Sequence, residues 1–189
     1  NPLAKFGIGR PNTLAIHPGF GQSMTTRADP RADMYFELDG TQYNFHNSNN
    51  TALVWAQNSS AIPFISMVEL KMYEAEAKLM SGDPAGAQTA LTAAIDASMA
   101  QIGVSDAAAI ATYKAANGDL SAGATDQDKL NIIITEAYYA LYGHQMHTAW
   151  TNFRRTGFPA MTPAANGAGG LDPSGAMPVR WLYPNGEKQ

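Results

Sequence analysis

Aromatic and amide-bearing side chains gather between residues 43 and 55, in a segment that is otherwise polar and rich in asparagine. Sugars present apolar C–H faces that stack on aromatic rings, while side-chain amides form hydrogen bonds with their hydroxyl groups. We therefore predict a carbohydrate-binding site here, and the alternative is that Trp55 only pins the loop to the body of the protein. The candidate residues are Trp55, Tyr43, Phe45, His46, Asn44 and Asn47.

His144 and His147 are three residues apart in a helical pattern, which is a spacing that lets two side chains share a metal ion. A zinc site needs further ligands and a second shell of hydrogen bonds. No carboxylate follows at a useful spacing, and the nearest upstream acid is Glu136. We interpret the pair as part of an ordinary helix face and expect no metal or other cofactor.

Glu69, Glu74 and Glu76 raise the question of glycoside hydrolysis. That chemistry needs two carboxyl groups facing one cleft, about 5–9.5 Å apart. Here Lys71 and Lys78 balance the acids along one helix. We predict a solvated charged face and a protein that is not an enzyme.

Two further groups have structural interpretations. Arg154 and Arg155 stand at the end of a helical pattern, where cations bond terminal carbonyls and complement the helix dipole. An aromatic band precedes them, and rings at helical spacing usually fill a core. The band consists of Tyr138, Tyr139, Tyr142 and Trp150.

The composition excludes several classes of protein. The net charge is -4 and the only adjacent basic pair is Arg154-Arg155, so a strong nucleic-acid binder is excluded because such proteins cluster Lys and Arg. There is no cysteine, which rules out disulfides and thiolate catalysis. No apolar run approaches the roughly 20 residues that cross a bilayer. No signal peptide opens the chain, and we interpret it as a piece of a longer protein.

Three zones must position these residues within what we predict to be a single fragment, residues 1–189. Residues 1–62 are rich in turn formers, with one small β-hairpin predicted across Asp39-Gly40. Residues 63–156 form a helical body. Residues 157–189 are an irregular tail rich in Gly and Pro, which Trp181, Leu182 and Tyr183 could anchor on the helices. The fold class is mainly α, with extensive irregular loops.

The helical body opens with an antiparallel hairpin over residues 63–102, of the kind used in tetratricopeptide scaffolds. Its first helix begins at Pro63 and ends at Ser81-Gly82, and its second begins with Asp83 as N-cap and Pro84 at the first helical position. A weaker helix is predicted over 106–116. A long helix follows from the Thr125–Asp128 capping box to about residue 153, with Gly143 as a mild weak point.

Four short sequence motifs follow one another along the chain in an order that is typical of one protein family. Asp29-Pro30-Arg31 comes first, then the Glu-rich hairpin helix that starts at Met67, then Trp-Thr-Asn-Phe-Arg-Arg-Thr-Gly-Phe-Pro over 150–159, and finally Arg-Trp-Leu-Tyr-Pro over 180–184. Over roughly residues 29–185, the chain resembles the middle-to-C-terminal part of SusD/RagB-type nutrient-binding lipoproteins. Within that family, the chain resembles most the SusD-like subgroup that is described as starch-binding and outer-membrane-associated.

The resemblance implies a non-catalytic protein on the outer membrane of a Gram-negative bacterium, exposed at the cell surface and held there by the parent protein's lipid anchor. Such proteins bind oligosaccharide nutrients and deliver them to a SusC-type TonB-dependent transporter. The family supplies no catalytic residues to carry over. Two alternatives stay open: a helical-repeat protein-interaction scaffold without a small-molecule ligand, and a glycoside hydrolase accessory piece or metalloenzyme.

Overall fold

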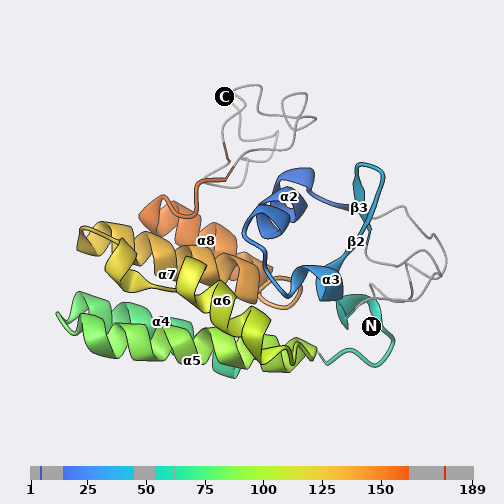
Figure 1. Cartoon of the computed structure of the whole chain (residues 1–189). Coiled ribbons are helices and arrows are strands. Elements are labelled where there is room, and N and C mark those ends of the chain that lie inside the picture. The colour runs from blue at the N-terminus through green and yellow to red at the C-terminus, as the bar shows by residue number, and fades with distance from the viewer. Residues whose placement is uncertain (1–4, 6–14, 45–53, 62, 162–176, 178–189) are drawn as a thin grey trace, which may run out of the picture.

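Helices dominate the computed structural model, which describes residues 5, 15–44, 54–61, 63–161 and 177. A helical body formed by residues 67–156 lies beside a smaller unit formed by residues 15–44, which holds a short sheet and two helices (Figure 1). This arrangement confirms the predicted mainly α fold with one small β-hairpin.

The predicted hairpin consists of α4 (Met67–Met80) and α5 (Pro84–Ile102), which run antiparallel along each other (Figure 1). Asp83 caps α5 by accepting a hydrogen bond from the Gly86 amide at 2.8 Å, and Pro84 takes the first helical position. The predicted start of α4 at Pro63 was early, because Ser66 has extended backbone angles and caps the helix through the Glu69 amide.

The first hydrophobic core lies between these helices and α7. The α4 side chains Val68, Met72, Ala75 and Leu79 are buried there. They pack on a face of α5 that is dominated by small residues. That face consists of Ala87, Ala90, Leu91, Ala94, Ile95 and Ser98.

Capping residues define the next two helices. Asp106 caps α6 (Ala107–Asn117), and the predicted capping box between Thr125 and Asp128 opens α7 (Asp126–Ala140). Between them lies the short 3-10 helix η2 (Leu120–Ala122), whose Leu120 belongs to the first core.

The predicted long helix is in fact two helices, α7 and α8 (Met146–Thr156), separated by a turn over residues 141–145. Gly143 takes a φ of 85° in this turn, a left-handed conformation that suits glycine. A Cβ at that position would overlap the Trp55 indole ring. Gly143, the predicted weak point of the long helix, is therefore a break in it, and the Trp55 ring packs against this break. α8 ends at Thr156, three residues beyond the predicted end of the helical pattern, and Gly157 caps it with a left-handed φ of 80°.

The N-terminal unit contains β1 (Ala15–Ile16), α2 (Pro18–Thr26), α3 (Ala32–Tyr35), β2 (Glu37–Asp39) and β3 (Gln42–Asn44). The strands form an antiparallel sheet in the order β1-β3-β2. Gly40, with a φ of 60°, forms the tight turn of the predicted hairpin. The first hairpin strand begins only at Glu37, because Met34 and Tyr35 belong to α3.

A second, aromatic core joins this unit to the helical body. Tyr139 of α7 and Ile102 of α5 contribute to it from the body, and η1 (Val54–Ala56) contributes Trp55. The N-terminal unit supplies the remaining members, which are Ile16, Phe20, Met24, Tyr35, Phe36 and Tyr43. The α2–α3 unit is thus fixed on the helices by shared hydrophobic packing.

Within the described ranges, no helix is both long and apolar enough to cross a bilayer. The predicted anchors of the tail, Trp181, Leu182 and Tyr183, lie outside the residues that the structure describes.

Candidate functional site

The structure buries the described part of the predicted carbohydrate site. Tyr43 is 8% exposed, Asn44 4% and Trp55 6%. Tyr43 packs edge-on against Phe36, with ring centroids 4.9 Å apart. A sugar cannot stack on a ring face that the core covers, so these two rings serve packing in this structure.

The remaining candidates of that segment, Phe45, His46 and Asn47, lie outside the described residues. Ligand binding by the segment therefore stays a prediction, now centred on these three residues. The stated alternative for Trp55, a ring that pins the loop to the body, matches its packing beside Gly143 and His144.

The two histidines do not share a helix. His144 lies in the turn before α8, where its ring packs on Trp55 at a centroid distance of 4.9 Å, whereas His147 is exposed on α8 itself. Burial lowers the pKa of His144 below its ordinary value. The i,i+3 geometry on which a shared metal would depend is absent from this pair.

The three glutamates of α4 differ in their partners, and only one of them lies on a solvated charged face. Glu74 fits that prediction, since it pairs with Lys71 at 2.6 Å and Lys78 at 3.0 Å, and hydrogen bonds from both lysines lower its pKa. Glu69, however, is buried and accepts a hydrogen bond from Tyr73 at 3.0 Å. Glu76 forms an ion pair with Arg155 of α8. The solvated-face interpretation was thus wrong for Glu69 and Glu76.

A buried ionic network, absent from the sequence-based predictions, holds the α2–α3 unit on the body. The fully buried Arg31 forms a bidentate pair with Asp29, through Nε at 2.8 Å and Nη2 at 2.6 Å. Its guanidinium also donates to Ser98 of α5 at 3.1 Å and to the Tyr113 hydroxyl of α6 at 2.7 Å.

Glu136 of α7 completes this network. It accepts a hydrogen bond from the Tyr113 hydroxyl at 2.9 Å and forms an ion pair with Arg27. Burial raises the pKa of Glu136, although Arg31 and Arg27 oppose that effect. The two arginines balance Asp29 and Glu136, which is the condition under which buried charges are tolerated. The network thus links α5, α6 and α7 to the residues between α2 and α3.

The helices α2 and α7 also enclose a pocket of about 320 Å³, which we call the α2–α7 pocket. That volume lies at the lower end of the range of about 300–1,000 Å³ for ligand sites. Aromatic rings from both helices line it, and the residues after α8 form another wall. The lining consists of His17, Gly19, Phe20, Ser23, Tyr138, Tyr139, Pro159, Ala160, Met161 and Met177.

The aromatic side of the pocket is built from interlocked rings. Phe20 stacks on Tyr142 at a centroid distance of 4.5 Å and meets Tyr138 edge-on at 5.3 Å. Tyr138 and Tyr142 are only half-buried, so the prediction that the aromatic band fills the core fits Tyr139 more closely. The rings are held in place from both helices and still leave part of Tyr138 accessible.

Polar groups of the pocket are suited to hydroxyl ligands. Burial raises the pKa of Tyr138 to about 12, so its hydroxyl is neutral near pH 7 and can donate or accept a hydrogen bond. The Tyr139 hydroxyl donates to Ser23 at 2.9 Å, and the exposed His17 lies at the start of α2. An aromatic ring beside hydrogen-bond donors and acceptors is a pattern suited to saccharide recognition.

Sequence reasoning missed this pocket because it predicted no helix over 18–26. The signal was present in His17-Pro18-Gly19, which lies within the segment that we described only as rich in turn formers. In the structure His17 caps α2 by accepting a hydrogen bond from the Gly19 amide, and Pro18 occupies the first turn.

Comparison with known protein families shows to which family the chain belongs. The model of a SusD-like family, described as starch-binding and associating with the outer membrane, matches residues 1–184. The chain belongs to this SusD-like family, as the strings in the sequence indicated. No curated protein matches the sequence.

A solved structure gives the same fold. The chain is similar to a SusD homolog from Bacteroides fragilis, with a TM-score of 0.67 and 19% sequence identity. The match covers 90% of this chain and 44% of the homolog. The chain therefore spans less than half the length of the structure it matches.

Proposed function

We propose that this chain belongs to a non-catalytic cell-surface protein that binds oligosaccharides and delivers them to a SusC-type TonB-dependent transporter in the outer membrane. Membership of a family described as starch-binding and outer-membrane-associated supports the ligand class and the location. The main structural support for glycan binding by this part of the protein is the aromatic α2–α7 pocket.

Tyr138 is the central sugar contact in this proposal. Its ring is fixed by Phe20 and Tyr139, with centroids 5.3 and 5.2 Å away, so little side-chain freedom is lost when a sugar binds. Ser23 and His17 offer polar contacts at the rim.

The pocket favours binding over hydrolysis. Its lining contains no carboxylate among the described residues, whereas the usual glycosidase mechanism requires a pair of them. Glu76 and Glu74, the paired acids of α4, are held by Arg155 and by Lys71 and Lys78. The proposed role is therefore capture of an intact glycan.

Calorimetry on the complete gene product with a panel of α- and β-linked oligosaccharides tests this function. Tyr138→Ala should weaken the affinity for the bound glycan roughly tenfold or more, since loss of one aromatic contact costs about 1.4 kcal/mol or more. Phe153→Ala removes a half-buried aromatic side chain of α8 outside the pocket and is the matched control. Unchanged affinity in Tyr138→Ala contradicts the assignment of the pocket.

The loop prediction is separated from the pocket by a second pair of variants. Phe45→Ala and His46→Ala should lower the affinity if the segment around them contacts the glycan, and should leave it unchanged if the α2–α7 pocket acts alone. Absence of binding to every glycan in the panel would favour the alternative of a protein-interaction scaffold.

Delivery to a transporter requires a physical complex. Purification of the complete gene product from its native outer membrane should co-isolate a TonB-dependent transporter, and deletion of the gene should slow uptake of the glycan identified by calorimetry. Normal uptake in the deletion strain would contradict a role in delivery.

A further inference from the structure

Two hydroxyl groups of the α2–α7 pocket form a hydrogen-bond chain with a defined direction. The Ser23 hydroxyl donates its proton to the Phe20 carbonyl at 2.7 Å. The Tyr139 hydroxyl donates its own proton to the Ser23 oxygen at 2.9 Å. A hydroxyl group has one proton and two lone pairs, so both protons of this chain are already used. The two oxygens therefore offer a ligand only lone pairs, which accept hydrogen bonds.

His17 offers the opposite kind of contact at the start of α2. Its Nδ1 atom accepts a hydrogen bond from the Gly19 amide at 3.1 Å. The proton of a neutral imidazole with this acceptor lies on Nε2, and the exposed ring can donate it. His17, Phe20 and Ser23 follow each other at intervals of three residues, which places them on one side of α2. That side therefore carries a donor, an aromatic ring and an acceptor, in this order.

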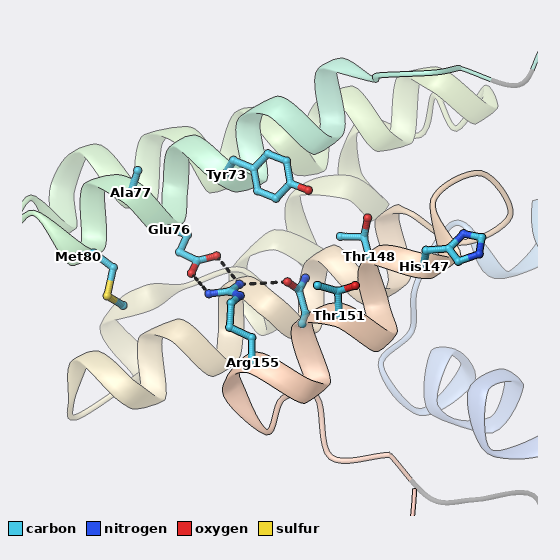
Figure 2. Close-up of a pocket in the computed structure, with 9 residues that line it drawn as sticks. Tyr73, Glu76, Ala77, Met80, His147, Thr148, Thr151 and Arg155 are labelled. Carbon is cyan, nitrogen blue, oxygen red and sulfur yellow. Dashed lines mark hydrogen bonds and ion pairs between the residues drawn. The ribbon is translucent and has the colours of Figure 1, made fainter. Parts of the chain in front are cut away.

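The described lining of this pocket contains no Asp, Glu, Lys or Arg side chain. Two other pockets of the described residues differ in this respect. The groove of about 590 Å³ between α4 and α8 contains the ion pair of Glu76 with Arg155 (Figure 2). A pocket of about 620 Å³ beside α3 is lined in part by Asp29, Asp33 and Glu37. The described lining of the α2–α7 pocket thus lacks the lysine or arginine that a carboxylate or sulfate group needs when it leaves water.

We propose that the α2–α7 pocket selects neutral saccharides, and that Ser23 and Tyr139 determine this selectivity by accepting a hydrogen bond from one sugar hydroxyl. This selectivity presupposes the proposed glycan binding in the pocket and adds to it the class of glycan. A sugar hydroxyl fits because it can direct its proton at the remaining lone pairs of Ser23 and Tyr139. The half-buried Tyr138 ring belongs to the same lining and can contact the apolar C–H face of the sugar.

Acidic sugars fit this arrangement poorly. The oxygen atoms of a carboxylate or sulfate group only accept hydrogen bonds. Against Ser23 and Tyr139 those atoms face lone pairs and receive no proton. Burial of a charge without a partner is costly, so an acidic sugar loses more free energy on entering the pocket than a neutral one. A neutral hydroxyl avoids both costs, because it has a proton to donate and no charge to bury.

Calorimetry on the complete gene product compares two sets of probes. The neutral set contains gluco-, manno-, galacto- and xylo-oligosaccharides, and the acidic set contains oligosaccharides of galacturonate and glucuronate together with heparin fragments. At least one neutral probe should bind in a manner that Tyr138→Ala weakens, and every acidic probe should bind at least roughly tenfold less tightly. An acidic probe that binds through Tyr138 with an affinity closer than that overturns the selectivity but leaves glycan binding intact. Absence of Tyr138-dependent binding by any probe contradicts the proposed function itself.

Fluorinated sugars test the direction of the hydrogen bond. Each hydroxyl of the tightest-binding neutral probe is replaced in turn by fluorine, which accepts hydrogen bonds weakly and cannot donate one. At one position or more the replacement should lower the affinity roughly tenfold, as expected for the loss of a hydrogen bond in a partly buried site. Full affinity at every position would show that no hydroxyl acts as a donor, and that result overturns the proposal.

Ser23→Ala identifies the acceptor. It removes one acceptor and frees the Tyr139 proton, which can then be donated to fluorine, so the preference for hydroxyl over fluorine should fall from roughly tenfold to about threefold or less. A purely structural effect would lower both affinities equally, and an unchanged preference overturns the proposal. Thr26→Ala is the matched control and should retain the full preference. Thr26 is exposed on α2 outside the pocket, and its hydroxyl also donates to a backbone carbonyl, that of Gln22 at 2.9 Å.

Discussion

Gly143 lies directly beneath the Trp55 ring, and the space of a Cβ at this position is occupied by the indole. The contact connects the turn between α7 and α8 to a residue 88 positions earlier in the chain (143 − 55). The break between α7 and α8 is thus coupled to the burial of Trp55, a residue that we had predicted to bind ligand. The turn at Gly143 makes room for the indole ring, and the packed ring in turn requires a glycine at this position.

Gly143→Ala should destabilise the fold strongly. The left-handed φ of 85° costs a residue with a Cβ about 1–2 kcal/mol, and displacement of Trp55 adds to that cost. We expect a loss of about 2–4 kcal/mol in the free energy of unfolding, measured by urea denaturation. Gly82→Ala is the matched control, because Gly82 has a φ of 82° and no neighbour within 4 Å of an added Cβ. An equal loss in both variants would show that the Trp55 contact contributes nothing.

Arg31→Met should be among the most damaging substitutions in the chain. It leaves Asp29 buried without its bidentate partner and removes donors to Ser98 and Tyr113. Breaking one side of a buried ion pair costs about 3–5 kcal/mol. Equilibrium unfolding followed by circular dichroism measures the loss. A double variant, Asp29→Leu with Arg31→Met, should be less destabilised than Arg31→Met alone, and the opposite order would contradict a paired role.

His144 should make stability depend on pH. Its pKa is lowered in the folded protein by burial beside Trp55, so the unfolded chain binds the proton more tightly. The folded state is therefore favoured above the unfolded-state pKa of about 6.5, and stability falls as the pH drops from there through the folded-state pKa. Melting temperatures between pH 7.5 and 5.0 should fall less in His144→Gln than in the natural protein. His147→Gln, at an exposed site on α8, should retain the natural pH dependence.

Thr125→Ala tests the capping box. The Thr125 hydroxyl accepts a hydrogen bond from the Asp128 amide at 3.1 Å, while the Asp128 carboxylate accepts one from the Thr125 amide at 2.9 Å. Loss of such a cap costs about 1 kcal/mol. Thr112→Ala, at an exposed position within α6, should change the free energy of unfolding by no more than about 0.5 kcal/mol. The same denaturation experiment compares the two, and a larger effect of Thr112→Ala would contradict the importance of the cap.

Local signals explain what could be predicted from sequence. Asp83-Pro84, Asp106 and Thr125 with Asp128 all act within one helical turn, and each begins a helix as predicted. The hairpin turn at Gly40 is equally local. Strings shared with the family gave the class of protein without any knowledge of packing.

Long-range packing explains what could not be predicted. Arg27 and Glu136 are 109 residues apart, and no periodicity joins them. Tyr43 and Trp55 belong to a polar stretch, yet the core that covers them is completed by Phe36, Tyr139 and Tyr142 from elsewhere in the chain. The α2–α7 pocket likewise needs segments that lie far apart in the chain, so it became visible only once the fold was assembled.

The network around Arg31 has a consequence for binding. The α2–α3 unit cannot separate from α5, α6 and α7 without breaking the ion pairs that Glu136 of α7 forms with Arg27 and Arg31. We therefore expect the two cores to unfold together, in one cooperative transition. A ligand that enters between α2 and α7 meets walls that are already rigid, so recognition is closer to lock-and-key than to folding coupled to binding.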